Sequence, residues 1–94
     1  MPHYVYMIVC DDGSFYTGYT RNVASRMKLH MMGKGARYTR IHKPSKLVYT
    51  EEFGSRAEAM RRERRLKALT HDQKRRLTWS HGVAEGRARR GKGQ

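Results

Sequence analysis

The chain has 94 residues, a length that suits a single domain with a modest hydrophobic core. Its formal net charge of +13, from 21 Lys and Arg against 8 Asp and Glu, favours binding to polyanions, with nucleic acid first and an anionic membrane surface second. A single cysteine excludes a disulfide framework and a multi-cysteine zinc site, and no apolar run approaches the roughly 20 residues that span a bilayer, so we expect a cytoplasmic protein without a membrane partner.

The N-terminal part of the sequence predicts a β-hairpin. Residues 4–10 are rich in aromatic and β-branched side chains, which is typical of a strand that is covered on both faces. Residues 11–14 have the Asp and Gly composition of a turn, and residues 15–20 follow as a second strand. The two strands are therefore expected to lie side by side.

A helix is predicted after the hairpin. Asn22 can cap its first turn, because an Asn side chain accepts hydrogen bonds from backbone N–H groups. Gly33 can end the helix, because glycine tolerates a positive φ. Between them Val23, Met27 and Met31 recur at helical spacing, so the helix has an apolar stripe that can face the sheet.

The second half of the chain begins with a basic segment, residues 33–44, that shows no periodicity and is predicted to be a loop. Residues 47–53 follow as a third strand, which we expect to be short and antiparallel. Capping boxes at residues 55–58 and 70–73 then predict two further helices, the second of which reaches about Trp79.

Together these elements predict an α+β domain. A small three-stranded antiparallel sheet is flanked by three helices in the chain order β-β-α-β-α-α. Residues 82–94 are rich in Gly and Arg and lack an apolar pattern, so we expect a disordered basic tail there. The expected division is therefore a folded domain over residues 1–81 followed by this tail.

One acidic residue does not fit the surface pattern of the second helix. On a helical wheel Glu63 falls with Ala59 and Leu66 on the side that should face the core. A buried carboxylate needs a partner, protonation or a bound cation. An ion pair with Lys67, one helical turn further on, would also satisfy it, and the spacing alone does not separate the two explanations.

Four more polar residues fall close to the predicted core. Arg26 and His30 share one face of the first helix, and Tyr6 and Tyr16 lie in the two hairpin strands. Each also has a purely structural explanation. The Arg26 side chain could extend so that its charge reaches water, and His30 could bond to a backbone carbonyl. Tyr6 and Tyr16 could be an aromatic pair that packs in the sheet. A single site on one concave face of the sheet would account for these four residues and Glu63 together.

These residues resemble the GIY-YIG nuclease family, and within it the small standalone bacterial members, similar to the N-terminal nuclease domain of excinuclease C. The resemblance covers about residues 4–77. Tyr4 and Val5 replace the Gly and Ile of the first motif, and Thr17 replaces the Ile of the second, all at positions that pack rather than react. The resemblance is carried by Tyr4, Tyr6, Tyr16, Gly18, Arg26, His30, Gly33, Gly35, Ala36, Tyr38, Thr39 and Glu63.

The resemblance implies a metal-dependent endonuclease that hydrolyses phosphodiester bonds. Glu63 would hold one divalent cation, Mg²⁺ or Mn²⁺, together with water and the phosphate. Tyr16 would be the general base toward the attacking water, with Tyr6 beside it. Arg26 would stabilise charge at the phosphorus centre, and His30 would orient a tyrosine or the phosphate, or relay a proton.

The basic residues are expected to bind the nucleic acid itself. DNA is favoured over RNA as the partner, and the expected process is repair or recombination. No attached specificity domain is evident, so cutting would be structure-selective or weakly specific. The main alternative is a non-catalytic DNA- or RNA-binding module on the same fold, and a weaker one is a domain that docks an acidic protein. The expected phosphate contacts are Lys34, Arg37, Arg40, Lys43, Arg61, Arg62 and Arg65.

Overall fold

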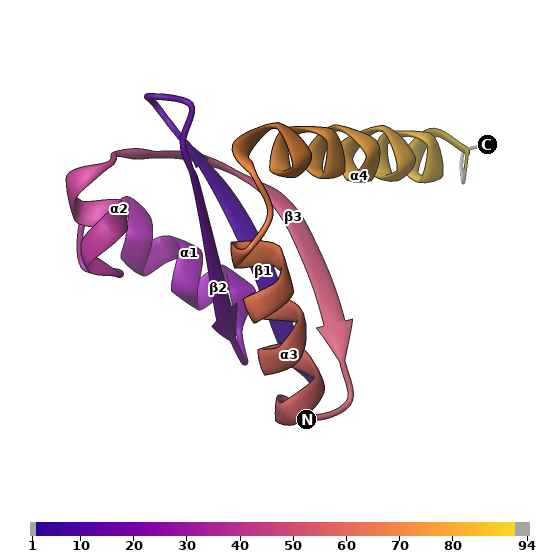
Figure 1. The fold of residues 1–94 in the computed structure, drawn as a ribbon, viewed down its shortest axis with the longest axis horizontal. Helices are drawn as coiled ribbons and strands as arrows, with labels where there is room; N and C mark the ends of the chain where they lie inside the picture. Colours follow the sequence, from indigo (N-terminus) through magenta and orange to yellow (C-terminus); the bar gives the residue numbers. More distant parts are fainter. Residues whose placement is uncertain (1, 92–94) are drawn as a thin grey trace.

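The computed structural model describes the backbone of residues 2–91 and the side chains of residues 2–81. It has the predicted α+β class and order, with one additional short helix (Figure 1). None of the helices in the described part of the chain combines the length and the apolar character of a membrane-spanning segment. The elements are β1 (His3–Cys10), β2 (Phe15–Thr20), α1 (Val23–Met31), α2 (Arg37–Ile41), β3 (Pro44–Phe53), α3 (Arg56–Lys67) and α4 (His71–Gly91).

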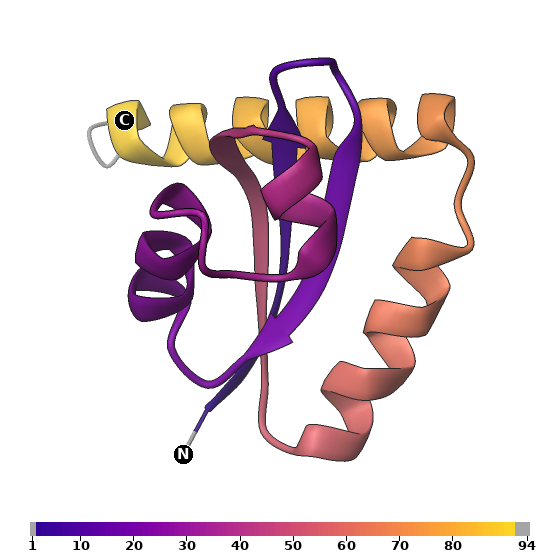
Figure 2. The ribbon, with the colours of Figure 1, turned by 90° about the vertical axis from the view of Figure 1, so that its left-hand side faces the viewer.

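The three strands form one antiparallel sheet in the order β2-β1-β3, which confirms the predicted hairpin and third strand. The central strand β1 is covered on both faces, as its composition predicts. In Figure 2 the helices α1 and α2 lie on one side of the sheet, α3 lies on the other, and α4 crosses one end. Both faces of β1 are therefore available to hold side chains away from water.

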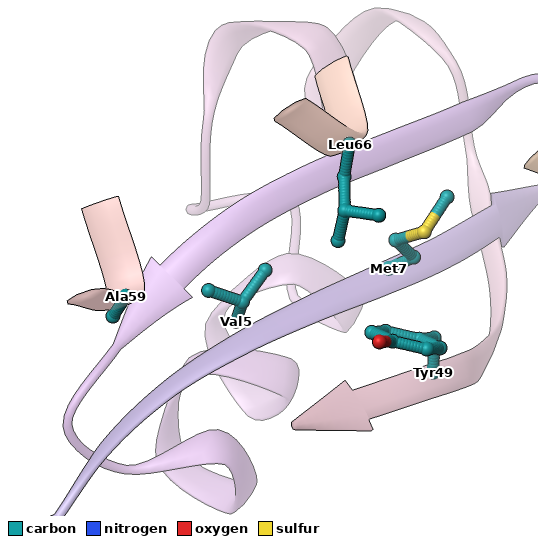
Figure 3. Close-up of a cluster of buried hydrophobic side chains, with 5 residues drawn as sticks. All are labelled: Val5, Met7, Tyr49, Ala59 and Leu66. Carbon is teal, nitrogen blue, oxygen red and sulfur yellow. The ribbon is translucent and has the colours of Figure 1, made fainter. Parts of the chain in front are cut away.

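The face of the sheet under α3 carries an apolar core. Val5 and Met7 of β1 meet Tyr49 of β3 and the two buried side chains of α3, Ala59 and Leu66 (Figure 3). Ala59 and Leu66 are seven residues apart, two helical turns, so a single stripe of α3 makes this contact. This cluster fixes α3 against the sheet.

The opposite face of the sheet is partly polar. Tyr6, Ile8 and Cys10 of β1 pack there with partly buried residues of the helices on that side, Met27 of α1 and Tyr38 of α2. The strand alternation that sends Val5 and Met7 to the apolar core sends Tyr6 to this face. The candidate site is built here.

Three predicted boundaries differ from the structure. The predicted basic loop over residues 33–44 contains the helix α2. The third strand is not short as predicted: it spans 10 residues and begins at Pro44 rather than at residue 47. A proline is tolerated there because it is the first residue of an edge strand. The helix α4 runs to Gly91 rather than to about Trp79, through a segment that contains the strong helix formers Ala, Glu and Arg.

The division at residue 81 remains a prediction. The side chains of residues 82–91 are not described, and residues 92–94 of the predicted tail lie outside the described backbone.

Candidate active site

Tyr6 lies at the centre of the candidate site. It sits midway along β1, opposite Gly18 of β2, and its side chain is 1% exposed. Its phenol oxygen lies 2.8 Å from Nε2 of His30, which reaches the sheet from α1 and is itself 1% exposed. The sheet and the first helix therefore hold these two predicted site residues in direct contact.

Tyr16 completes an aromatic group around His30. Its ring centroid lies 5.2 Å from that of His30 and 6.1 Å from that of Tyr6. On its other side the Tyr16 ring lies 5.9 Å from Tyr38 of α2. Tyr16 is half-buried whereas Tyr6 is buried, so Tyr16 is the phenol that has access to solvent.

The second ring nitrogen of His30 also has a partner. Nδ1 lies 2.7 Å from the Thr39 hydroxyl oxygen, and that hydroxyl donates to the backbone carbonyl of Ala36 at 3.0 Å. Burial lowers the pKa of His30 below its ordinary value, and the nearby Arg26 guanidinium lowers it further. His30 is therefore neutral at pH 7.

Two glycines allow these rings to approach the backbone. A Cβ atom on Gly18 would lie 2.5 Å from the Tyr6 phenol oxygen, and one on Gly35 would lie 2.2 Å from Nδ1 of His30. Both distances are far inside van der Waals contact, so no other residue fits without displacing a ring. Sequence reasoning did not assign a site role to Thr39, Gly18 or Gly35, although all three belong to the motifs that carry the family resemblance.

The charges of Arg26 and Glu63 both affect the pKa of the Tyr6 phenol. Burial raises the pKa of Tyr6 well above its ordinary value, the neighbouring Tyr16 and the Glu63 carboxylate raise it further, and the Arg26 guanidinium opposes them. Among the described side chains no carboxylate forms an ion pair with half-buried Arg26. The charges of Arg26 and Glu63 therefore both affect the buried phenol at the centre of the candidate site.

Glu63 comes from an unexpected side of the sheet. The sequence predicts one concave face for all five residues, whereas α3 covers the face opposite to α1 and α2. The helix also contacts the edge strand β2, and the Glu63 side chain is only 17% exposed. Its carboxylate lies 3.5 Å from Nζ of Lys67, so the simple i,i+4 pair that the spacing allows is present as well.

A metal at this site would rest on one carboxylate. Among the side chains of residues 2–81, no group of three or more His, Cys, Asp or Glu residues is arranged to hold an ion. A single carboxylate with water and substrate phosphate is a common way to bind Mg²⁺, so Glu63 fits this mode and the described residues do not fit a closed protein cage. The exposed Lys67 offers weak competition for the carboxylate.

The predicted phosphate contacts fall in two groups. Lys34, Arg37, Arg40 and Lys43 are exposed along the segment that carries α2, on the same side of the sheet as His30. Arg61 and Arg65 are exposed on α3 and line an open groove that includes Phe53.

Arg62 is less accessible than the other arginines of this set. Its Nε donates to the Glu51 carboxylate at 3.0 Å, and its Nη2 lies 3.3 Å from the Tyr49 phenol. A side chain that is already paired in this way is a weaker candidate for a phosphate contact than its exposed neighbours.

Comparison with known proteins shows the family of the chain. The model of the GIY-YIG catalytic domain matches residues 2–76. The chain belongs to the GIY-YIG family. Two UPF0213 proteins, from Staphylococcus haemolyticus and Halobacterium salinarum, are each 53% identical over 72 residues, which is 77% of this chain and 88% and 94% of theirs.

The family fold is also seen in solved relatives. The solution structure of the UPF0213 protein BH0048 from Bacillus halodurans is 50% identical and superimposes with a TM-score of 0.57 over 87% of both chains. That of protein EF2693 from E. faecalis is 38% identical, with a TM-score of 0.58 over 86% of this chain and 88% of that one. The names of these relatives state no activity, so the GIY-YIG membership carries the link to nucleases.

Proposed function

We propose that this GIY-YIG protein is a metal-dependent endonuclease that hydrolyses phosphodiester bonds in nucleic acid, with DNA favoured over RNA as the partner, in repair or recombination. The observation that carries the proposal is the environment of Tyr6: its phenol oxygen lies 2.8 Å from buried His30, its ring lies beside that of Tyr16, and the charges of Arg26 and Glu63 both affect its pKa. Binding alone does not require this set. The cytoplasmic location and the absence of a membrane partner stay predictions.

The two tyrosines have different parts in the proposed reaction. The Tyr6 hydroxyl is buried, lies 2.8 Å from Nε2 of neutral His30 and has a raised pKa, so it stays protonated and acts as a fixed hydrogen-bonding group. Tyr16 is half-buried beside it and can face an attacking water, which makes Tyr16 the better placed general base. This assignment is the one that the family resemblance implies.

The charged residues Arg26 and Glu63 would stabilise the negative charge of the phosphate, Arg26 directly and Glu63 through a bound cation. Arg26 has no carboxylate partner among the described residues, so its guanidinium can stabilise the negative charge that develops on the phosphoryl oxygens. Glu63 would hold one Mg²⁺ or Mn²⁺, whose chemistry is to polarise the phosphate and lower the pKa of bound water. His30 orients Tyr6 within this arrangement.

A cleavage assay tests the proposal. Labelled single-stranded DNA, duplex, flap and RNA substrates are incubated with Mg²⁺, with Mn²⁺ and with chelator. Glu63→Ala should lower metal-dependent cutting by about 10²–10³-fold, the cost typical of losing one group that stabilises transition-state charge, while binding is largely retained. Glu58→Ala is the matched control, because Glu58 is an exposed carboxylate on the same helix and should leave cutting unchanged.

Two results would overturn parts of this proposal. Undiminished cleavage by Glu63→Ala would remove Glu63 from the metal role. Tight binding without cleavage of any substrate in either metal would favour a non-catalytic DNA- or RNA-binding module on the same fold.

A further inference from the structure

The hydrogen-bond chain behind Tyr6 has a defined direction. The carbonyl oxygen of Ala36 can only accept, so the proton of the Thr39 hydroxyl is committed to that carbonyl. The Thr39 oxygen must then accept the 2.7 Å hydrogen bond from His30, which requires a proton on Nδ1 of the ring. The other ring nitrogen, Nε2, lies 2.8 Å from the Tyr6 phenol.

We infer that Thr39 is a positioning residue that holds neutral His30 in the Nδ1–H tautomer, so that the Nε2 lone pair accepts the Tyr6 hydroxyl. The tautomer follows from the hydrogen bonds alone. Its importance for cutting rests on the proposed nuclease function.

The surroundings of His30 support a single tautomer. The ring is 1% exposed, so water cannot offer either nitrogen an alternative partner. Gly35 lies against Nδ1 so closely that a Cβ atom would be 2.2 Å away, which leaves Thr39 as the group that satisfies that nitrogen. Burial and the Arg26 charge both disfavour a doubly protonated ring.

The tautomer sets the orientation of Tyr6. With its hydrogen directed to His30, the Tyr6 oxygen presents its lone pairs elsewhere, and the Tyr16 phenol lies beside it. Tyr6 is then an acceptor toward Tyr16 or a water. In the opposite tautomer Nε2–H would donate to Tyr6, and the phenol would turn its own hydrogen toward Tyr16.

Nitrogen-15 NMR of the histidine rings reads the tautomer directly, because protonated and unprotonated ring nitrogens have well separated shifts. We expect wild type and Thr39→Ser to show a protonated Nδ1 and an unprotonated Nε2 at His30. Thr39→Val lacks the acceptor and should shift His30 toward the Nε2–H form. A wild-type ring protonated on Nε2 alone, or a Thr39→Val ring that keeps the wild-type pattern, would overturn the inference.

Thr78→Val is the matched control. The Thr78 hydroxyl donates to the carbonyl three residues earlier, Arg75, at 3.1 Å, just as Thr39 donates to Ala36, but Thr78 lies on α4. The Thr78→Val substitution should leave the protonation pattern of the His30 ring nitrogens unchanged. A changed pattern in this variant would overturn the inference that Thr39 sets the tautomer. The wild-type and Thr39→Ser spectra decide the question even where Thr39→Val fails to fold.

Kinetics then test the link to cutting. Thr39→Val should lose about 10–100-fold in kcat with little change in KM, the cost typical of groups that orient a direct ligand, and Thr39→Ser should recover most of it. A tautomer that shifts without loss of cutting would overturn the positioning role while leaving the proposed nuclease function intact. Absence of cutting in wild type would overturn the proposed function, and the tautomer result would stand by itself.

Discussion

Of the contacts around Tyr6, the sequence predicts the one within the hairpin and misses the one between helices. The sequence predicts Tyr6 and Tyr16 as neighbours because a hairpin with a short turn places its two strands side by side. It does not predict the contact between His30 and Thr39, because that contact depends on how α2 folds back against α1. Local patterns specify strand neighbours, whereas contacts between elements require the tertiary arrangement.

Gly35 tests how tightly the site is packed. In Gly35→Ala the added Cβ would lie 2.2 Å from Nδ1 of His30, so the ring or the backbone must move. We expect a loss of about 1–3 kcal/mol in the free energy of unfolding, the range for overpacking a filled interior, together with a strong loss of cutting. Urea unfolding and the cleavage assay measure the two effects.

Gly54 provides the control for this substitution. No atom lies within 4 Å of a Cβ built there, so Gly54→Ala should change stability by less than about 0.5 kcal/mol. Equal effects of the two substitutions would show that the close approach at Gly35 is not what constrains the site.

Among the elements, α2 is the one that sequence reasoning missed. It spans only five residues, too few to show helical periodicity, and an isolated helix of that length is not stable in water. Tertiary contacts hold it instead: the Tyr38 ring lies 5.9 Å from that of Tyr16 in β2, and Thr39 is bonded to His30 of α1. A helix stabilised in this way has no signature of its own in the sequence.

The longer elements were predicted because each carries a local signal. The Asn22 side chain accepts from Ser25 N at 2.9 Å, and the Ser55 side chain accepts from Glu58 N at 3.2 Å, as their capping patterns predict. The continuous apolar run of β1 likewise reflects its central position in the sheet. Boundaries were less accurate, since the ends of β3 and α4 depend on pairing and context.

The cations of α2 test whether this element binds the substrate. Arg37 and Arg40 are exposed, and neither forms an ion pair among the described side chains. We expect Arg37→Gln/Arg40→Gln to weaken binding to all sequences and to lower the slope of log affinity against log salt by about two, one for each phosphate that is no longer neutralised. Fluorescence anisotropy over a salt series measures this slope.

Arg75→Gln/Arg76→Gln removes the same number of charges elsewhere. Both arginines already pair with Asp72, each at 2.6 Å, so this double variant should change the slope less. Equal losses in the two variants would mean that net charge, rather than α2, determines binding.

Over the whole molecule, the site depends on a sheet that is covered on both faces. Helices α1 and α2 lie on one side of the sheet and α3 lies on the other (Figure 2). His30 and Arg26 belong to α1 and Thr39 to α2, whereas Glu63, whose charge affects the pKa of Tyr6, belongs to α3.

Of the residues predicted to share one face, Tyr6, Tyr16 and His30 are in contact, whereas Glu63 comes from the helix on the opposite side of the sheet and its metal role stays a prediction. The sequence also left open whether Glu63 pairs with Lys67 or holds a cation. The structure contains the pair, and the Glu63 charge also raises the pKa of Tyr6.

The most direct test of the account is whether a cation held by Glu63 lies beside the tyrosines and His30. Paramagnetic Mn²⁺ is titrated into the protein, and the broadening of the ring NMR signals is compared between wild type and Glu63→Gln. We predict that Mn²⁺ broadens the signals of Tyr6, Tyr16 and His30 in wild type and leaves them sharp in the variant. Broadening that is confined to other residues, or that is unchanged in Glu63→Gln, would contradict the account.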